Sequence, residues 1–122
     1  MRMLTVGLCV LALTSSAFAQ PKPAPAYLIA EYEVTDAASM KKFGEAVAPL
    51  LKAQGGLVIA RRSKIAPVIG EAPKAVTIVM FESLAKAQAY FESPEYKAVI
   101  QLRDKGAKWH SYIVEAGDNP LP

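Results

Sequence analysis

The sequence predicts one α+β domain of the ferredoxin-like class, with strands and helices in the order β-α-β-β-α-β. Four segments rich in β-branched and aromatic residues predict the strands. Two stretches with apolar residues at helical spacing separate the first strand from the second and the third from the fourth. A four-stranded antiparallel sheet with both helices on one face covers the apolar side of each helix.

The first strand is predicted at residues 27–34, where side chains alternate between two faces. Asp36 is a favourable N-cap for the following helix, because its carboxylate accepts hydrogen bonds from free backbone N–H groups. The apolar stripe of that helix comprises Met40, Phe43, Val47, Leu50 and Leu51. Pro49 lacks a backbone donor, so we expect a kink there, and Gly55-Gly56 ends the helix.

The second and third strands are predicted at residues 57–61 and 75–81, and a turn at residues 70–73 precedes the third. Residues 65–69 extend the second strand only as an edge or a bulge, because Pro67 cannot donate a hydrogen bond to a neighbouring strand. The third strand is almost wholly apolar, which indicates that both of its faces are covered.

The second helical region begins after Ser83 and restarts at Ser93-Pro94-Glu95, where serine suits the N-cap and proline the first turn. It ends near Gly106, and the last strand is predicted at residues 109–116. The helices leave one sheet face bare, and apolar residues such as Ile29 lie on that face. We therefore expect a homodimer in which two sheets pack face to face as a dimeric α+β barrel.

The N-terminus has the form of a secretory signal peptide over residues 1–19. Arg2 precedes a short apolar run, and Ala17 and Ala19 supply the small residues that signal peptidase needs for a cut after Ala19. The run is shorter than the roughly 20 apolar residues that span a bilayer, so we expect no stable membrane anchor after cleavage. These features predict a periplasmic or secreted bacterial protein.

The remaining residues divide into three predicted segments. Residues 20–26 contain three prolines and are predicted to form a flexible tether. Residues 27–117 form the predicted domain, without a repeat or an internal linker, and residues 118–122 are predicted to be a disordered tail.

Composition excludes several classes of chemistry. Cleavage removes the single cysteine, Cys9, so the predicted domain has no disulfide, thiol nucleophile or thiolate metal site. The formal net charge is only +3 and the basic residues are not clustered, so nucleic acid is not an expected partner. No phosphate loop or nucleotide fingerprint is present, and no cofactor is expected. His110 is the only histidine, so no metal site is predicted, although carboxylates together with His110 leave that question open.

A set of short motifs resembles a known family. The motifs are Pro49, Gly55-Gly56, Arg61, Val68-Ile69-Gly70-Glu71, Phe81-Glu82-Ser83-Leu84, Ala87, Tyr90-Phe91, Ser93-Pro94-Glu95-Tyr96, Arg103 and Val114-Glu115-Ala116-Gly117. Together they resemble the domain of unknown function 1330 family, in the dimeric α+β-barrel superfamily. Ala72-Pro73-Lys74 departs from the arginine-rich segment usual there. The resemblance implies the fold and dimerisation, and it implies no particular activity.

His110 and Glu31 are the candidate catalytic residues. His110 shares a predicted strand face with Tyr112 and is either a general base or a strand histidine bonded to backbone or water. Glu31 and Glu33 project from one face, and burial in a dimer interior would suit them to acid–base work. The alternative is that they lie in water or pair with the arginines at residues 61 and 62.

Tyr96 and Arg103 lie two helical turns apart and hence on one helix face. They either present a hydroxyl and a guanidinium to an acidic ligand, or Tyr96 packs on the sheet while Arg103 extends to water. The aromatic residues Trp109, Tyr90 and Phe91 are expected to belong to the core.

Three functions fit these features. The first is a domain that binds a small organic ligand in a cavity between sheet and helices, with Arg61, Tyr96, Arg103 and His110 as its polar contacts. The second is a cofactor-independent oxygenase- or isomerase-like enzyme, as in the wider superfamily, which uses His110 beside Glu31. The third is a protein-interaction module of the cell envelope that uses the edge near Pro67. The sequence leaves open whether the protein is an enzyme.

Overall fold

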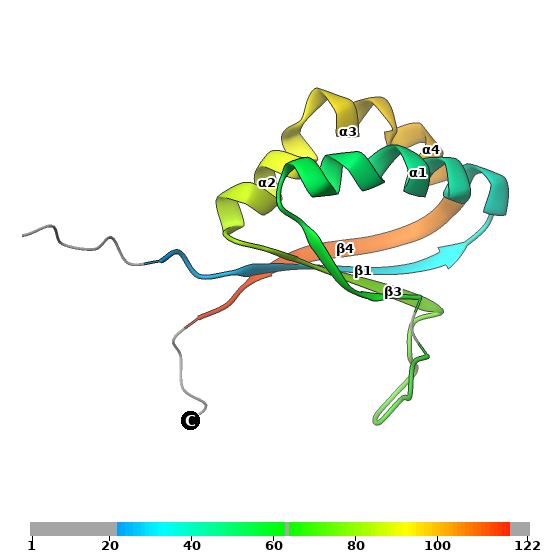
Figure 1. Ribbon diagram of the computed structural model, residues 1–122. Helices are drawn as coiled ribbons and strands as arrows, with labels where there is room; N and C mark the ends of the chain where they lie inside the picture. Colours follow the sequence, from blue (N-terminus) through cyan, green and yellow to red (C-terminus); the bar gives the residue numbers. More distant parts are fainter. Residues whose placement is uncertain (1–21, 63, 118–122) are drawn as a thin grey trace, which may run out of the picture.

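The computed structural model describes residues 22–62 and 64–117 and confirms the predicted ferredoxin-like order. The strands are β1 (Ala26–Val34), β2 (Leu57–Arg61), β3 (Ala75–Phe81) and β4 (Ala107–Glu115). They form one antiparallel sheet in the order β2-β3-β1-β4. The helices are α1 (Ala37–Ala53), α2 (Leu84–Glu92), α3 (Pro94–Ala98) and α4 (Ile100–Gly106). Figure 1 shows all of them on one side of the sheet.

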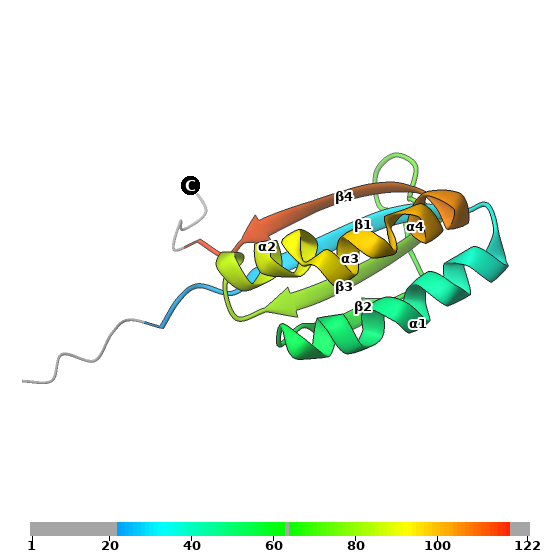
Figure 2. The ribbon, with the colours of Figure 1, turned by 90° about the horizontal axis from the view of Figure 1, so that it is seen from above.

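Seen from above, the helices form two rows (Figure 2). One row is α1, which lies over the β2 side of the sheet, and the other is the run α2, α3 and α4 on the β1 and β4 side. Among the described residues, none of these helices has the length and apolar character needed to cross a bilayer.

The predicted helix starts are present, but the second helical region has three pieces instead of two. The hydroxyl oxygen of Ser83 accepts a hydrogen bond from the backbone N–H of Lys86 (3.2 Å), and that of Ser93 accepts one from Tyr96 (3.2 Å). A further break occurs at Val99, whose backbone (φ −109°, ψ 4°) leaves helical geometry between α3 and α4. No capping residue in the sequence indicates this break.

Helix α1 begins directly after Asp36, as predicted, but the Asp36 carboxylate makes no capping hydrogen bond to the helix backbone. Ser39 donates a hydrogen bond to Asp36 Oδ2 (2.6 Å), and this bond, together with the nearby backbone N–H groups and the charge of Lys105, lowers the pKa of Asp36. The acid therefore stays ionised at the positive end of the helix dipole. The helix runs through Pro49 to Ala53, and the chain then turns at Gly55, whose φ of 71° favours glycine.

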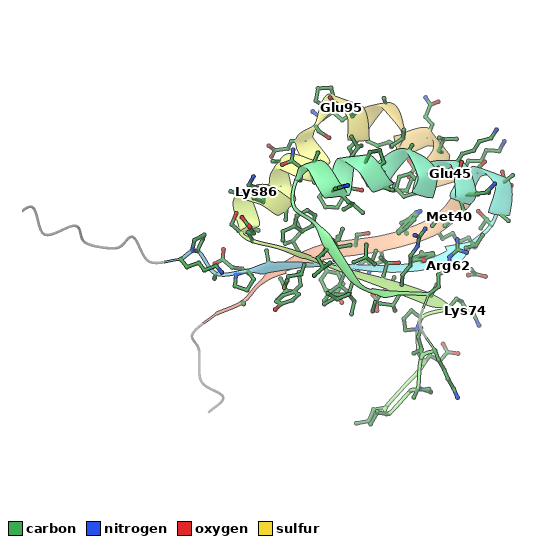
Figure 3. The ribbon with its side chains drawn as sticks, in the orientation of Figure 1. Met40, Glu45, Arg62, Lys74, Lys86 and Glu95 are labelled. Carbon is green, nitrogen blue, oxygen red and sulfur yellow. The ribbon has the colours of Figure 1, made fainter. Side chains whose placement is uncertain are left out.

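The core lies between the sheet and the two rows of helices. Alternate residues of β1 are buried there, and they face buried residues of α1 and the aromatic residues of α2 and α3. The buried apolar residues are Ala26, Leu28, Ala30, Tyr32, Met40, Phe43, Val47, Val79, Phe81, Ala87, Tyr90, Tyr96 and Ala107. Met40 projects from α1 toward the sheet (Figure 3). Alternate side chains of the central strands thus pack against the helices.

Within residues 22–62 and 64–117, no helix lies on the opposite face of the sheet, as predicted. Its apolar part contains Tyr27, Ile29, Leu57, Val76, Ile78, Met80, Tyr112 and Val114, which we call the open face. At one end, beside Val34 and the start of β4, the same surface becomes charged, with Glu31, Glu33, Lys108 and His110. The surface is therefore apolar over most of its area and polar at one end.

The loop between β2 and β3 projects on the side of the open face (Figure 1). Residues 65–69 form a loop there and do not extend β2. Arg62 and Lys74 lie at its base (Figure 3), and Val68 and Ile69 are 92% and 95% exposed. Two large apolar side chains thus stand free beside an uncovered apolar sheet.

Candidate functional site

A cavity of about 210 Å³ lies between the helix-covered face of the sheet and the helices. Six aromatic side chains line it: Tyr32, Phe43, Tyr90, Phe91, Tyr96 and Trp109. Aliphatic residues of β1, β3 and α1 complete the wall, and the polar lining residues are Lys52, Arg61, Thr77 and Ser111. A mostly apolar hollow with few polar groups is the usual form of a small-molecule site.

The aromatic wall is a connected network. The rings of Tyr32 and Trp109 stack at 4.4 Å, and Phe43 meets Trp109 edge to face at 5.6 Å. The ring of Tyr96 lies 4.9 Å from those of both Tyr90 and Phe91. The ring of Phe43 meets that of Tyr96 edge to face at 6.3 Å and connects the two groups. The contacts therefore join β1, β4, α1, α2 and α3, and the shape of the cavity depends on the packing of the whole domain.

Arg61 reaches the cavity because β2 contains a bulge. Leu57 pairs with Met80 and Val58 with Val79, but the next pair is Ala60 with Ile78, which leaves Ile59 as an extra residue. Arg61 then lies opposite Thr77, on the helix-covered face. Without the extra residue, strict alternation would turn Arg61 to the open face. Arg61 lines the cavity, as its proposed role requires.

Tyr96 of α3 and Arg103 of α4 are in contact across the break at Val99, so they do not lie on the single helix face that the sequence predicts, and only Tyr96 lines the cavity. Arg103 donates a hydrogen bond from Nη1 to Tyr96 Oη (3.0 Å), and its Nε and Nη2 contact Asp104 Oδ1. Partial burial works against its charge, but the bonds to Tyr96 and Asp104 dominate and raise the pKa of Arg103. Its backbone oxygen accepts a hydrogen bond from the indole of Trp109 (3.0 Å). Arg103 therefore holds two wall residues in place.

The buried tyrosine of α2 contributes a neutral hydroxyl. Burial, together with the neighbouring Tyr96, raises the pKa of Tyr90. Among the hydrogen bonds of residues 22–62 and 64–117, none involves the Tyr90 hydroxyl. Tyr90 is one of the residues that line the cavity.

His110 does not lie where the cavity hypothesis placed it. It pairs with Glu31 across β1 and β4 on the opposite face of the sheet, and its side chain is 77% exposed. The alternation of β4 explains this, because Trp109 packs inward on Tyr32 and its neighbour must point outward. His110 Nδ1 lies 3.1 Å from Glu31 Oε2. Its role as a catalytic or binding residue stays a prediction, but it is not a contact of this cavity.

The structure also shows the ion-pair partners of the acidic residues of β1 and whether metal-ligating side chains cluster. Glu31 pairs with His110, and no ion pair joins Glu31 or Glu33 to Arg61 or Arg62 in the described part of the chain. That part also contains no group of three or more metal-ligating side chains.

Several wall residues were not recognised as site residues in the sequence. Tyr90, Phe91 and Trp109 were assigned to the core, and they both pack there and line the cavity. Tyr32 and Thr77 share a hydrogen bond (3.2 Å) at the cavity floor. The available signal was their common strand face, since both follow the alternation that turns β1 and β3 inward.

The fold and this cavity define an α+β domain of the ferredoxin-like class with an aromatic hollow between sheet and helices. The chain belongs to the family of the domain of unknown function DUF1330, whose model matches residues 25–117. No curated protein matches the sequence significantly.

Solved structures share the fold at low sequence identity. The chain is similar to RPA0582, a protein of unknown function from Rhodopseudomonas palustris, with a TM-score of 0.64, 16% identity and coverage of 79% of this chain and 85% of that one. It is similar to SnoaB, a cofactor-independent oxygenase from Streptomyces nogalater, with a TM-score of 0.56, 11% identity and coverage of 81% and 98%. A dimeric ferredoxin-like protein of unknown function from Thermobifida fusca has a TM-score of 0.53, 12% identity and coverage of 78% and 93%.

Proposed function

We propose that this protein is an exported, homodimeric domain that binds a small organic molecule in the cavity between its sheet and helices. The observation that carries the proposal is the cavity of about 210 Å³ with six aromatic side chains in its wall. A dry cavity of roughly 150 Å³ lined by apolar side chains is known to bind benzene. The cavity here is larger, so one ring with a short substituent fits.

Trp109 provides the test of ligand binding. It is the only tryptophan of the chain and lines the cavity, so a bound molecule changes its fluorescence. We expect at least one compound in a screen of single-ring molecules to change this emission and to raise the melting temperature. At ten times its Kd, such a ligand stabilises the fold by about 1.4 kcal/mol.

Two matched variants test whether the ligand binds in the cavity. Ala48 lies exposed on α1 and lines the cavity, whereas Ala53 is exposed on the same helix and does not. Ala48→Phe should obstruct binding, and Ala53→Phe should leave it unchanged. A screen with no stabilising compound, or equal binding to both variants, would remove the proposal.

Export is a separate part of the proposal. The signal-peptide pattern and the cut after Ala19 fall outside the described residues and rest on the sequence alone. We expect the mature protein from an envelope fraction to begin at Gln20. N-terminal sequencing checks this, and an intact Met1 on soluble cytoplasmic protein would contradict it.

The homodimer is supported by the open face. Apolar side chains cover most of it, and an uncovered apolar surface of this kind on a soluble protein marks a contact site. The similar protein from Thermobifida fusca is dimeric. The exposed Val68 and Ile69 project on the same side and would also meet a second copy.

A second candidate function is an enzyme that uses His110 and Glu31. Their contact of 3.1 Å is the geometry of a base oriented by a carboxylate. In the proposed dimer the partner's sheet would cover this pair. The fold of the chain resembles that of SnoaB, a cofactor-independent oxygenase. A compound bound between the two sheets, beside this pair, should then be converted under air by the wild type and not by His110→Gln. Unchanged compounds by mass spectrometry would remove this candidate.

A further inference from the structure

We propose that the ligand of the cavity is a small aromatic acid, whose ring lies against the aromatic wall and whose carboxylate binds Arg61. This inference rests on the proposed function, since it names the chemistry of a molecule in the same cavity. It differs from the sequence-based expectation, which gave a share of the polar contacts to Arg103 and His110.

Three local structural features position Arg61 at the cavity. The bulge at Ile59 turns its side chain to the helix-covered face. Gly44 of α1 makes room for it, because a Cβ there would lie 3.1 Å from Arg61 Nη2. Arg62 follows with a φ of 46°, an unusual value for a residue other than glycine, and ends the strand at this point. Arg61 thereby lines the cavity while its side chain stays exposed to solvent.

The guanidinium of Arg61 has no carboxylate partner in the described part of the chain. The ion pairs there join Lys41 to Glu45, Arg103 to Asp104, Lys105 to Asp36 and His110 to Glu31. Glu45 lines the neighbouring hollow with Arg61, but its partner is Lys41 at 3.4 Å. Arg61 therefore presents free donors, and a planar guanidinium suits a carboxylate because it can donate two parallel hydrogen bonds.

Arg103 is unsuited to the same task. Its donors are directed to Tyr96 and Asp104, and its side chain does not line the cavity. The other cation of the lining, Lys52, lies in the last turn of α1 and adds positive charge to the cavity wall. None of the described residues of the wall is acidic, so the charge of the wall is complementary to an anion.

The remainder of the site determines the body of the ligand. Its wall contains six aromatic side chains, which favour a planar aromatic group over a sugar or a peptide. The volume of about 210 Å³ limits that group to one ring with a short side chain.

Paired probes test the inference. Phenylacetate and its neutral counterpart phenylacetamide have the same ring and nearly the same shape, and benzoate with benzamide forms a second pair. Titration calorimetry and Trp109 fluorescence measure the affinity of each probe for the wild type, Arg61→Met and Arg62→Met. Arg62 is the matched control, because it carries the same charge and lines only the neighbouring hollow.

We expect the acids to bind the wild type about 10- to 100-fold more tightly than the amides. Arg61→Met should remove this preference, and Arg62→Met should retain it. Equal binding of acid and amide would overturn the inference and leave cavity binding intact, as would an acid preference that survives in Arg61→Met. If neither acid nor amide binds the wild type, the inference fails, and the screen of single-ring molecules decides the proposed function separately.

Discussion

Phe81→Ala should lower the free energy of unfolding by about 3–5 kcal/mol, the usual cost of removing a fully buried phenylalanine. Phe81 is 0% exposed and is one of the two largest fully enclosed side chains of the described residues. It lies at the end of β3, opposite Ala26 of β1, and its ring centroid is 5.9 Å from that of Tyr90. The backbone around it leaves little freedom to refill the space, since Gly56 already approaches its ring closely.

Urea denaturation of the mature protein measures the effect. Phe91→Ala is the matched control, because Phe91 is the same residue type, half-buried, and lines a hollow that already lacks part of its packing partners. Its removal should cost clearly less, since the cost rises with the new empty volume. Equal losses for the two variants would show that the core is not centred on Phe81.

The fold could be predicted because its signals are local. Alternation in β1 and helical spacing in α1 each follow from the residues of one segment, and Ser83 and Ser93 mark helix starts by their own side chains. The break at Val99 has no such marker. The position of the break depends on how α3 and α4 pack on the rest of the domain, so tertiary contacts and not the local sequence determine it.

The candidate site was less predictable, because the face that a strand residue takes depends on its neighbours. His110 was correctly grouped with Tyr112, but which side of the sheet they share is decided by the stacking of Trp109 on Tyr32. Arg61 was a candidate by its residue type and as one of the motifs of the family resemblance. Its route into the cavity depends on the bulge at Ile59, which is a property of the β2–β3 pairing and not of β2 itself.

Tyr112→Glu should convert the proposed dimer into a folded monomer. Tyr112 lies on the open face and is 41% exposed in the single chain, so the fold tolerates a charge there. In a face-to-face dimer the new carboxylate would be enclosed against apolar residues of the partner. An uncompensated buried charge costs about 3–5 kcal/mol, and the twofold symmetry of a homodimer applies this cost twice. The dissociation constant should therefore rise by at least about 100-fold.

Sedimentation of the mature protein across a range of concentrations checks this result. Ala85→Glu is the matched control, because Ala85 is exposed on α2, at the opposite surface of the domain, and receives the same charge. The control should remain dimeric, and both variants should keep the wild-type circular dichroism spectrum. A wild type that sediments as a monomer at micromolar concentration would refute the dimer. A Tyr112→Glu variant that stays as dimeric as the control would place the contact on another surface, and the pair of His110 and Glu31 would then remain in water.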